Sequence, residues 1–277
     1  MSYSLHDRPD TEELVQYRNP LGVFDRLTSA FLARLRPAGF ASALKSVLHR
    51  NRVRIDTPNG KFLIDPFSHF GRELAITGDY EPQMRKTILH YLKPGDTFVD
   101  LGANEGFFSV QAAAICGSQG RVLAIEPQNR LLHTLRENLR LNEIGCVTVI
   151  NVAVSDRPGT AMLYLSPDIN TGGSGLTNAT RYPVRAQPTP LRTLSQVLDE
   201  SGVDRVDFMK VDIEGFEWEM LAGAAEVFST HRVRAMAMEI HESLLHRRGL
   251  DAGEILRKLE ALGYRIERPY GHWVWLA

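Results

Sequence analysis

Short apolar runs alternate with amphipathic segments from about residue 76 to the end of the chain. The runs are TFVDLG, RVLAIEP, CVTVINVAV, VDFMKVDIEG and VRAMAMEIH, and between them apolar residues recur at helical spacing, as at Leu131, Leu135 and Leu139. Strands that are buried on both faces form continuous apolar runs, and the helices that join them cover a parallel sheet. The pattern therefore predicts a doubly wound α/β fold.

The last part of the chain departs from this alternation. DAGEILRKLEALG predicts a helix that begins after Asp251 and ends at Gly263, and YRIERPYGHWVWLA predicts two strands around a turn. Between the central strands, we expect one helix over residues 82–92 and another from Phe216 to Phe228. The sheet is thus predicted to be mostly parallel and to end in an antiparallel hairpin.

The first 75 residues have a different pattern. Apolar residues at helical spacing run over residues 21–48, and the segment RVRIDTPNGKFLIDP alternates apolar and polar residues around Asn59–Gly60, which predicts a β-hairpin. Neither piece carries an obvious site. We therefore predict that residues 1–75 form an extension, as a cap or lid, and that residues 76–277 form the catalytic domain.

Composition narrows the class of protein. The 277 residues carry a formal net charge of −1, and 43% are hydrophobic and 23% charged, which excludes a disordered or low-complexity chain. The near-zero charge gives no pull toward nucleic acid or an anionic membrane. The two cysteines lack zinc-site spacing, no apolar run approaches the ~18–20 residues of a membrane span, and the N-terminus lacks the apolar core of a signal peptide. We expect a cytoplasmic protein without nucleic-acid or membrane partners.

The segment TFVDLGANEG is the strongest candidate for a cofactor loop. An apolar strand ends at Asp100, and Gly102, Asn104 and Gly106 form a tight turn into a helix, where backbone N–H groups can approach a ligand. Asn104 takes a position where dinucleotide loops have glycine, and asparagine tolerates positive φ. A carboxylate at Asp100 would repel a pyrophosphate but favour the cationic S-adenosylmethionine. The loop therefore predicts S-adenosylmethionine rather than a nicotinamide dinucleotide.

Acidic residues also follow the next two predicted strands. Glu126 in AIEP comes twenty residues after Gly106 and is placed to accept hydrogen bonds from both ribose hydroxyls. Asp156 in VAVSDRPG would accept from the adenine amino group, although Ser-Asp before Pro-Gly is also ordinary turn chemistry. The carboxyl ends of neighbouring parallel strands border one crevice, so these acids are predicted to share a site.

Two further pairs of polar residues end the fourth and fifth strands. Asp212 and Glu214 are two residues apart and so share a face, as do Glu239 and His241. Glu217 is interpreted as an acid in the positive first turn of a helix. We hypothesise that His241, oriented by Glu239 or Asp212, removes the proton of an acceptor hydroxyl. The alternatives are that these side chains bind a divalent cation, or that His241 is a satisfied core histidine.

Together these segments carry a family resemblance. DLGANEG, AIEP, ENLRLN and KVDIEGFEWEML resemble the FkbM family of S-adenosylmethionine-dependent methyltransferases over roughly residues 76–241. The resemblance implies a Rossmann-like class I methyltransferase fold with a seven-stranded, mostly parallel sheet, and O-methylation of a sugar or polyketide hydroxyl. ITGDYEP is similar to a family segment as well, which implies that Glu81 lies near the methionine end of the cofactor.

The sequence thus predicts an S-adenosylmethionine-dependent O-methyltransferase that acts on a small-molecule hydroxyl. Alternatives are a methyltransferase of RNA or protein side chains, a nicotinamide-dependent oxidoreductase, and a non-catalytic cofactor-binding module. The oligomeric state and a metal are left open, and a homo-oligomer is compatible. Residues 170–178 are a candidate substrate loop, and residues 181–192 are interpreted as a solvated loop. The predicted catalytic residues are His241, Asp212 and Glu239, and the predicted cofactor-binding residues are Glu81, Asp100, Gly102, Ala103, Asn104, Glu126, Pro127 and Asp156.

Overall fold

The computed structural model describes residues 52–277 except 168–169, 177–184, 269 and 271–273. The predicted helical segment over residues 21–48 and most of the Pro-Tyr-Gly turn lie outside the described residues. The strands are β1 (Val53–Thr57), β2 (Gly60–Ile64), β3 (Thr97–Leu101), β4 (Arg121–Ile125), β5 (Val147–Ile150), β6 (Ala153–Val154), β7 (Gly159–Tyr164), β8 (Ala186–Arg192), β9 (Phe208–Val211), β10 (Ala235–Met238), β11 (Arg265–Glu267) and β12 (Val274–Leu276). The helices are α3 (His69–Thr77), α4 (Pro82–Tyr91), α5 (Phe107–Cys116), α6 (Asn129–Leu141), α7 (Leu194–Glu200), α8 (Glu217–Ala222), α9 (Ala225–Ser229), α10 (Glu242–Arg247) and α11 (Ala252–Ala261), with a 3₁₀ turn at Thr171–Gly173.

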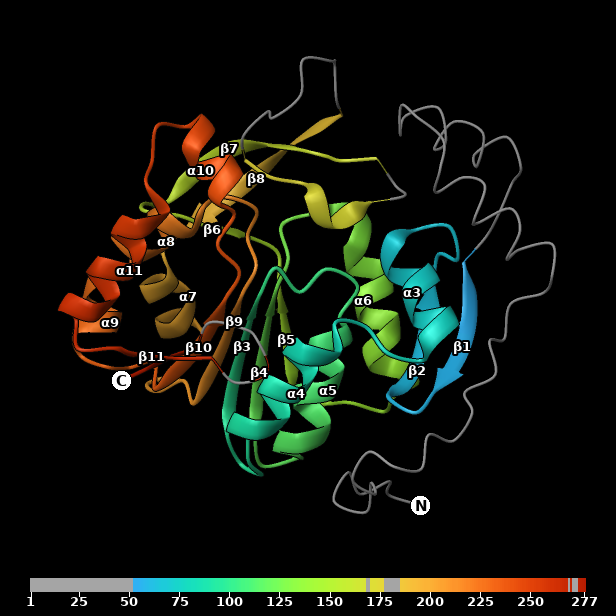
Figure 1. The fold of residues 1–277 in the computed structure, drawn as a ribbon. Helices are drawn as coiled ribbons and strands as arrows, with labels where there is room; N and C mark the ends of the chain where they lie inside the picture. Colours follow the sequence, from blue (N-terminus) through green and yellow to red (C-terminus); the bar gives the residue numbers. More distant parts are fainter. Residues whose placement is uncertain (1–51, 168–169, 177–184, 269, 271–273) are drawn as a thin grey trace.

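A seven-stranded sheet forms the centre of the molecule (Figure 1). Its strand order is β11-β12-β10-β9-β3-β4-β5, and the five strands from β10 to β5 are parallel. β12 pairs antiparallel with both β10 and β11. The predicted Rossmann-like α/β fold, with its antiparallel C-terminal hairpin, is confirmed.

Helices cover both faces of this sheet, so successive residues of the central strands enter two different cores. Val99 and Leu101 of β3 pack with α7, α8, α9 and α11, whereas Phe98 packs on the opposite side with α4 and α5 (Figure 1). All three side chains are fully buried. Burial on both faces explains why these strands form continuous apolar runs rather than alternating patterns. Among the described residues, no helix is long and apolar enough to cross a membrane.

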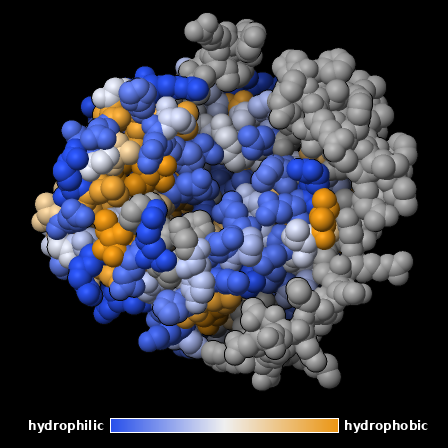
Figure 2. Space-filling model, viewed as in Figure 1, coloured by the Kyte–Doolittle hydropathy of each residue, from blue (hydrophilic) through white to orange (hydrophobic). Residues whose placement is uncertain are grey.

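The surface in the same view is hydrophilic over its central part, whereas hydrophobic residues gather mainly over α8 and α11 (Figure 2). α11 is amphipathic, and its buried face is formed by Ile255 and Leu259. Its N-cap is Asp251, whose side chain accepts a hydrogen bond from the backbone N–H of Gly253 at 2.9 Å. The predicted helix start after Asp251 is therefore confirmed.

The sequence pattern predicts one strand for the apolar run CVTVINVAV. In the structure, this run is divided between two strands. β5 belongs to the central sheet, whereas β6 starts a separate three-stranded sheet with the order β6-β8-β7. The interpretation of residues 181–192 as a solvated loop is also wrong for its second half, because residues 186–192 form β8. Pro188 and Pro190 are tolerated in β8 because that part of the strand pairs only with β7, on one side.

The helix predicted from Phe216 to Phe228 is interrupted. α8 ends before Gly223, and α9 begins two residues later. A Cβ at Gly223 would lie 2.4 Å from the backbone oxygen of Ser155. The helix is therefore interrupted at the point where the loop after β6 approaches it closely.

The predicted β-hairpin is confirmed and lies against α5 and α6. β1 and β2 pair antiparallel, with Thr57 opposite Gly60. The backbone N–H of Leu63 donates to the side chain of Asn138 in α6 at 2.7 Å, and Phe62 packs against Phe107 of α5. The division into residues 1–75 and 76–277 stays a prediction.

Candidate functional site

The predicted cofactor loop forms a tight turn between β3 and α5. Gly102, Asn104 and Gly106 have φ angles of 81°, 50° and 88°, so the three residues are left-handed, as their types allow. The backbone N–H groups of Gly102 and Ala103 both donate to the oxygen of Ile125 at 3.0 Å, which ties the loop to the end of β4. The loop is therefore held by the main sheet.

Gly102 is required here for space as well as for its backbone angle. A Cβ would lie 1.9 Å from the backbone oxygen of Asp212, whereas one at Gly95, with a similar φ of 87°, would meet nothing within 4 Å. We expect Gly95→Ala to lower the free energy of unfolding by about 1–2 kcal/mol, the left-handed strain alone. Gly102→Ala should cost about 1–3 kcal/mol more, because the backbone must also move. Urea denaturation of both variants measures the difference, and equal losses would contradict the close approach.

A cavity of about 600 Å³, part of it open to solvent, lies at the carboxyl ends of β3, β4 and β9. In open α/β sheets, ligands bind in a crevice at this edge. Four predicted cofactor residues line it, namely Gly102, Asn104, Glu126 and Pro127. Further lining residues are Gln128, Val152, Ala153, Val154, Leu163, Gly172, Ser174, Gly175, Leu176, Asp212, Ile213, Glu214 and Phe216.

Glu126 lines this cavity and is almost fully buried. Its carboxylate accepts hydrogen bonds from the backbone N–H groups of Asn104 at 2.7 Å and Gln128 at 2.8 Å. Burial raises the pKa of Glu126 to about 7, and these two N–H groups limit the rise. Through these two hydrogen bonds, the side chain of Glu126 connects the Gly102–Gly106 loop to Gln128.

Asp100 is fully buried beneath the loop and does not line the cavity. The hydroxyl of Ser109 donates to its Oδ2 at 2.7 Å, and Nζ of Lys210 lies 3.8 Å from its Oδ1. Burial raises the pKa of Asp100, and Lys210 opposes the rise. The charge that was expected to face the ligand is thus paired with a lysine, and contact between Asp100 and a cofactor stays a prediction.

Lys210 is a functional candidate that the sequence reasoning missed. Its Nζ donates to the backbone oxygen of Gly102 and to Oδ2 of Asp212, both at 3.3 Å. Burial alone would lower the pKa of Lys210, but the carboxylates of Asp212, Asp100 and Glu81 raise it, so the ammonium stays charged. A lone lysine within the apolar run VDFMKV is the signal that could have revealed it.

The placement of Asp156 needs correcting. The third strand of the main sheet is β5, which ends at Ile150, and Asp156 follows β6 in the other sheet. Its side chain is 38% exposed, lies 4.0 Å from Arg157 and does not line the cavity. The residue that follows β5 is Asn151, whose side chain donates to the backbone oxygen of Glu126 at 2.9 Å. The acid was misplaced because two strands were treated as one.

Four carboxylates surround His241 beside the cavity. We call Asp212, Glu214, Glu217, Glu239 and His241 the acid–histidine cluster. Nε2 of the histidine lies 3.4 Å from Glu214, 3.8 Å from Asp212 and 3.9 Å from Glu239. The structure therefore brings all three predicted catalytic residues together. Glu239 and His241 lie beyond the end of β10 rather than within the strand.

Glu217 has a different role from the one that the sequence suggested. It is fully buried at the start of α8, and its Oε1 pairs with Nδ1 of His241 at 2.8 Å and accepts from the backbone N–H of Gly215 at 3.1 Å. Interpretation as an acid that only complements the helix dipole is therefore wrong. His241 is oriented by Glu217, whereas Asp212 and Glu239 face its other nitrogen.

The ionisation of the cluster reflects this crowding. Burial lowers the pKa of His241, but its hydrogen bond to Glu217 and the charge of Glu214 outweigh burial and raise the value to about 9. Burial raises the pKa of Glu214 to about 7, against the opposing effect of His241. Burial and the charge of Asp212 raise the pKa of Glu239. The cluster thus concentrates negative charge around one imidazole.

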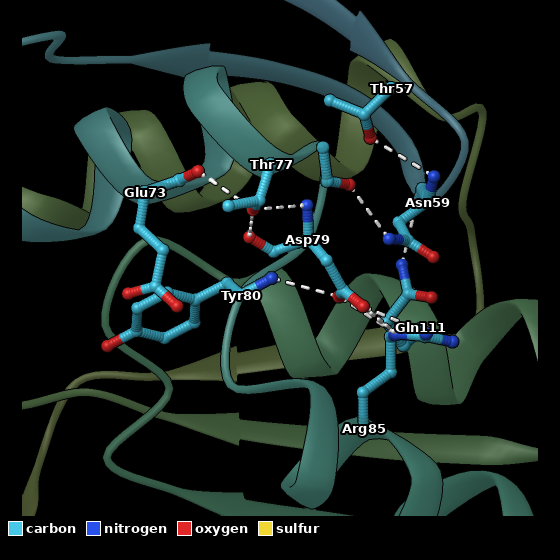
Figure 3. Close-up of polar contacts among 9 residues, drawn as sticks. Thr57, Asn59, Glu73, Thr77, Asp79, Tyr80, Arg85 and Gln111 are labelled. Carbon is cyan, nitrogen blue, oxygen red and sulfur yellow. Dashed lines mark hydrogen bonds and ion pairs between the residues drawn. The ribbon is translucent and has the colours of Figure 1, made fainter. Parts of the chain in front are cut away.

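Glu81 follows a hydrogen-bonded network around Asp79. Asp79 accepts from the guanidinium of Arg85 at 2.9 Å and from the backbone N–H of Tyr80 at 2.9 Å (Figure 3). Glu81, the residue after Tyr80, has a φ of 44° and is the N-cap of α4. Burial raises its pKa, whereas Lys210 and a hydrogen bond from Tyr80 lower it. Glu81 therefore lies within electrostatic reach of Lys210, and its contact with a cofactor stays a prediction.

The β-hairpin region is also joined to the cofactor loop through an ion pair. Both terminal nitrogens of Arg52 donate to the carboxylate of buried Glu105, at 2.6 and 3.0 Å. Arg52→Met should lower the free energy of unfolding by about 1–3 kcal/mol, because a buried carboxylate loses its partner. Arg54→Met, which breaks an exposed pair with Asp56, should cost about 0–1 kcal/mol. Thermal and urea denaturation measure the stability of both variants. Equal losses would show that the ion pair of Arg52 contributes no more to stability than the exposed pair of Arg54.

Comparison with known proteins shows the family to which the chain belongs. A family model described as "Methyltransferase FkbM domain" matches residues 100–266, more than half of the chain. Methyltransferase sdnD of Sordaria araneosa is 30% identical over 210 residues, which cover 65% of this chain and 78% of that protein. AMB antimetabolite synthetase AmbE of Pseudomonas aeruginosa is 25% identical over 256 residues, covering 79% of this chain and 12% of the synthetase.

Other similarities are more distant. Ribosomal protein L11 methyltransferase of Syntrophomonas wolfei is 24% identical over 165 residues, covering 54% of this chain and 52% of that protein. Among solved structures, methyltransferase FkbM of Methylobacillus flagellatus KT matches 74% of this chain and 52% of its own, at 17% identity and a TM-score of 0.46. The chain thus spans between about a tenth and four fifths of the curated relatives that it matches.

Proposed function

The chain belongs to the FkbM family of methyltransferases, and from this we propose that it transfers the methyl group of S-adenosylmethionine to a hydroxyl of a small molecule of the sugar or polyketide type. One observation carries the proposal. Asp212 and Glu214 belong both to the lining of the cavity beside the Gly102–Gly106 loop and to the acid–histidine cluster. A cofactor in the cavity would therefore present its methyl group to this cluster.

The cofactor end of the site fits a nucleoside with a cationic tail. Glu126 would accept hydrogen bonds from the ribose hydroxyls, and the backbone of Gly102 and Asn104 can approach the ligand closely because the loop is left-handed there. Acidic side chains gather toward Asp212 and Glu81, where a sulfonium and an ammonium would be favoured. A dinucleotide would instead bring a pyrophosphate to these acids.

The cluster would act on the acceptor. In the transfer, the acceptor oxygen forms a bond to the methyl carbon in line with the breaking carbon–sulfur bond, S-adenosylhomocysteine leaves, and the hydroxyl proton is removed. His241, Asp212 and Glu239 are the side chains we assign to this step. Glu217 fixes the imidazole, so that its Nε2 faces the acceptor side.

The class of acceptor rests on the relatives. AmbE is by name an antimetabolite synthetase, and its similarity to this chain supports a natural-product acceptor. The more distant ribosomal protein methyltransferase would support a protein acceptor. The near-zero net charge of −1 gives no basis for tracking a phosphate backbone.

The test is transfer of a labelled methyl group from S-adenosylmethionine to panels of glycosides and polyketides, with RNA and ribosomal proteins as parallel panels. Labelling of a sugar or polyketide at oxygen, located by mass spectrometry, is the expected result. Labelling confined to RNA or protein would overturn the small-molecule acceptor while leaving methyl transfer in place.

The pKa of Glu126 predicts how cofactor affinity depends on pH. Only the ionised carboxylate can accept from both ribose hydroxyls, and its pKa is raised to about 7 by burial, so binding must release a proton at lower pH. The dissociation constant of S-adenosylmethionine should therefore rise about tenfold from pH 8 to pH 6. Calorimetry at three pH values measures the slope. Glu126→Gln removes the titrating group, and an unchanged slope in this variant would contradict the assignment.

A further inference from the structure

We propose that the acid–histidine cluster is a divalent-cation site, with Nε2 of His241 and one carboxylate oxygen each of Asp212 and Glu214 as ligands and Glu239 completing the set. Binding of the cation stands on the geometry of these side chains. Its role in the reaction rests on the proposed function, because the site borders the cavity where the methyl group would lie.

The distances between the candidate ligand atoms support a common central ion. One atom from each of Asp212, Glu214 and His241 lies within 4.8 Å of the other two. Nε2 of His241 lies 3.4 Å from Oε2 of Glu214 and 3.8 Å from Oδ1 of Asp212. Ligands about 2.1 Å from an ion are about 3.4 Å apart at a tetrahedral angle, and somewhat closer in an octahedron. Small movements of the side chains would therefore close the site around an ion.

The orientation of His241 is an independent observation. A metal-binding histidine typically uses one ring nitrogen as ligand while the other donates to a carboxylate or carbonyl. Here Nδ1 pairs with Glu217 at 2.8 Å, and Nε2 is directed at three other carboxylates without a hydrogen bond to any of them. Glu217 is fully buried, and its second oxygen has no hydrogen-bond partner among the described residues. The imidazole is thus fixed in the orientation that a ligand needs.

Asp212 is fixed in a similar way. Lys210 donates to Oδ2 of Asp212 at 3.3 Å, whereas Oδ1 is the oxygen that faces His241. Lys210 in turn is held by the backbone oxygen of Gly102 at 3.3 Å. One oxygen is therefore used by the protein, and the other is left for a ligand.

The donor set indicates the class of ion. One imidazole with two or three carboxylates is a mixed nitrogen and oxygen set, which suits Mn²⁺ or Zn²⁺ and is less favourable for Mg²⁺, which prefers oxygen and retains water. Glu239 is half-exposed, so the site keeps an open side for a substrate oxygen. A cation there would lower the pKa of an acceptor hydroxyl, and the hydroxyl proton would pass to solvent or to a neighbouring carboxylate.

In the experiment, the full chain is first treated with a chelator and then titrated with Mn²⁺. Binding is measured by calorimetry and by the electron paramagnetic resonance signal of free Mn²⁺. We expect one site per chain. Asp212→Asn and His241→Ala should each weaken Mn²⁺ binding at least tenfold, and Glu217→Gln, which alters only the support of His241, about 10–100-fold. Glu242→Gln and His246→Ala, which change exposed residues of α10 outside the cluster, should leave affinity unchanged. Circular dichroism verifies that each variant is folded.

Binding of S-adenosylmethionine to the same samples separates this proposal from the proposed function. If wild-type protein binds the cofactor but no Mn²⁺ or Zn²⁺ in one-to-one ratio, the cation site is wrong and His241 acts without a metal. If the control variants lose Mn²⁺ as strongly as His241→Ala, the cluster is not the site. If Mn²⁺ binds and the cofactor does not, the cation site stands and the proposed function fails.

Discussion

His241→Ala is expected to lower kcat by about 10²–10⁴-fold, because the side chain that activates the acceptor hydroxyl is lost. The dissociation constant of S-adenosylmethionine should change less than about twofold, since His241 does not line the cavity. Single-turnover transfer of a labelled methyl group measures the first quantity, and calorimetry measures the second. A low kcat with intact cofactor binding is the pattern that assigns the residue to the acceptor side.

His246→Ala is the matched control for this prediction. His246 lies on the exposed side of α10, five residues from His241, and its removal should leave kcat unchanged. Near-wild-type turnover in the His241 variant would contradict a catalytic role. Loss of cofactor binding together with turnover would instead show that the cluster supports the cavity.

Glu126→Ala is expected to weaken binding of S-adenosylmethionine by about 10²–10⁴-fold. Two hydrogen bonds from ribose hydroxyls to a carboxylate are lost, and such charged bonds contribute about 1.5–3 kcal/mol each. The backbone N–H groups of Asn104 and Gln128 lose their acceptor as well, so the loop loosens. Calorimetry measures the dissociation constant directly.

The control for this variant is Glu137→Ala. Glu137 pairs with Arg140 on the outer surface of α6, away from the cavity, so its removal should not change cofactor affinity. Affinity within about threefold of wild type in the Glu126 variant would place the nucleoside elsewhere. Glu126 and Glu137 are both glutamates and differ only in position. The comparison therefore excludes the possibility that loss of any negative charge weakens cofactor binding.

The fold could be predicted because burial on both faces of a parallel sheet leaves a simple signature, as in β3 and β4. The signature fails where a strand changes sheets. Ile150 and Ala153 belong to one apolar run but to two sheets, and between them the side chain of Asn151 donates to the backbone oxygen of Glu126. Asp156 was misplaced for that reason. The hydrophobic pattern of the sequence indicates which residues are buried, but not to which sheet a strand belongs.

The candidate site could be predicted where an ionisable residue directly follows an apolar strand. Asp212 and His241 follow apolar strands, and the edge of a parallel sheet brings them together. Glu217 and Lys210 could not be assigned in this way. A glutamate at a helix start and a lysine in a strand acquire their roles only when tertiary packing places them against His241 and Asp100. Their partners lie 24 and 110 residues away in the sequence.

The most direct test of the proposed methyl transfer is calorimetric titration of the wild-type chain with S-adenosylmethionine, with NAD as the comparison. We expect one S-adenosylmethionine site per chain and no heat from NAD, because acids rather than phosphate-binding groups surround the end of the cavity near Asp212 and Glu81. Failure to bind S-adenosylmethionine, or equal affinity for the dinucleotide, would contradict the proposed methyl transfer.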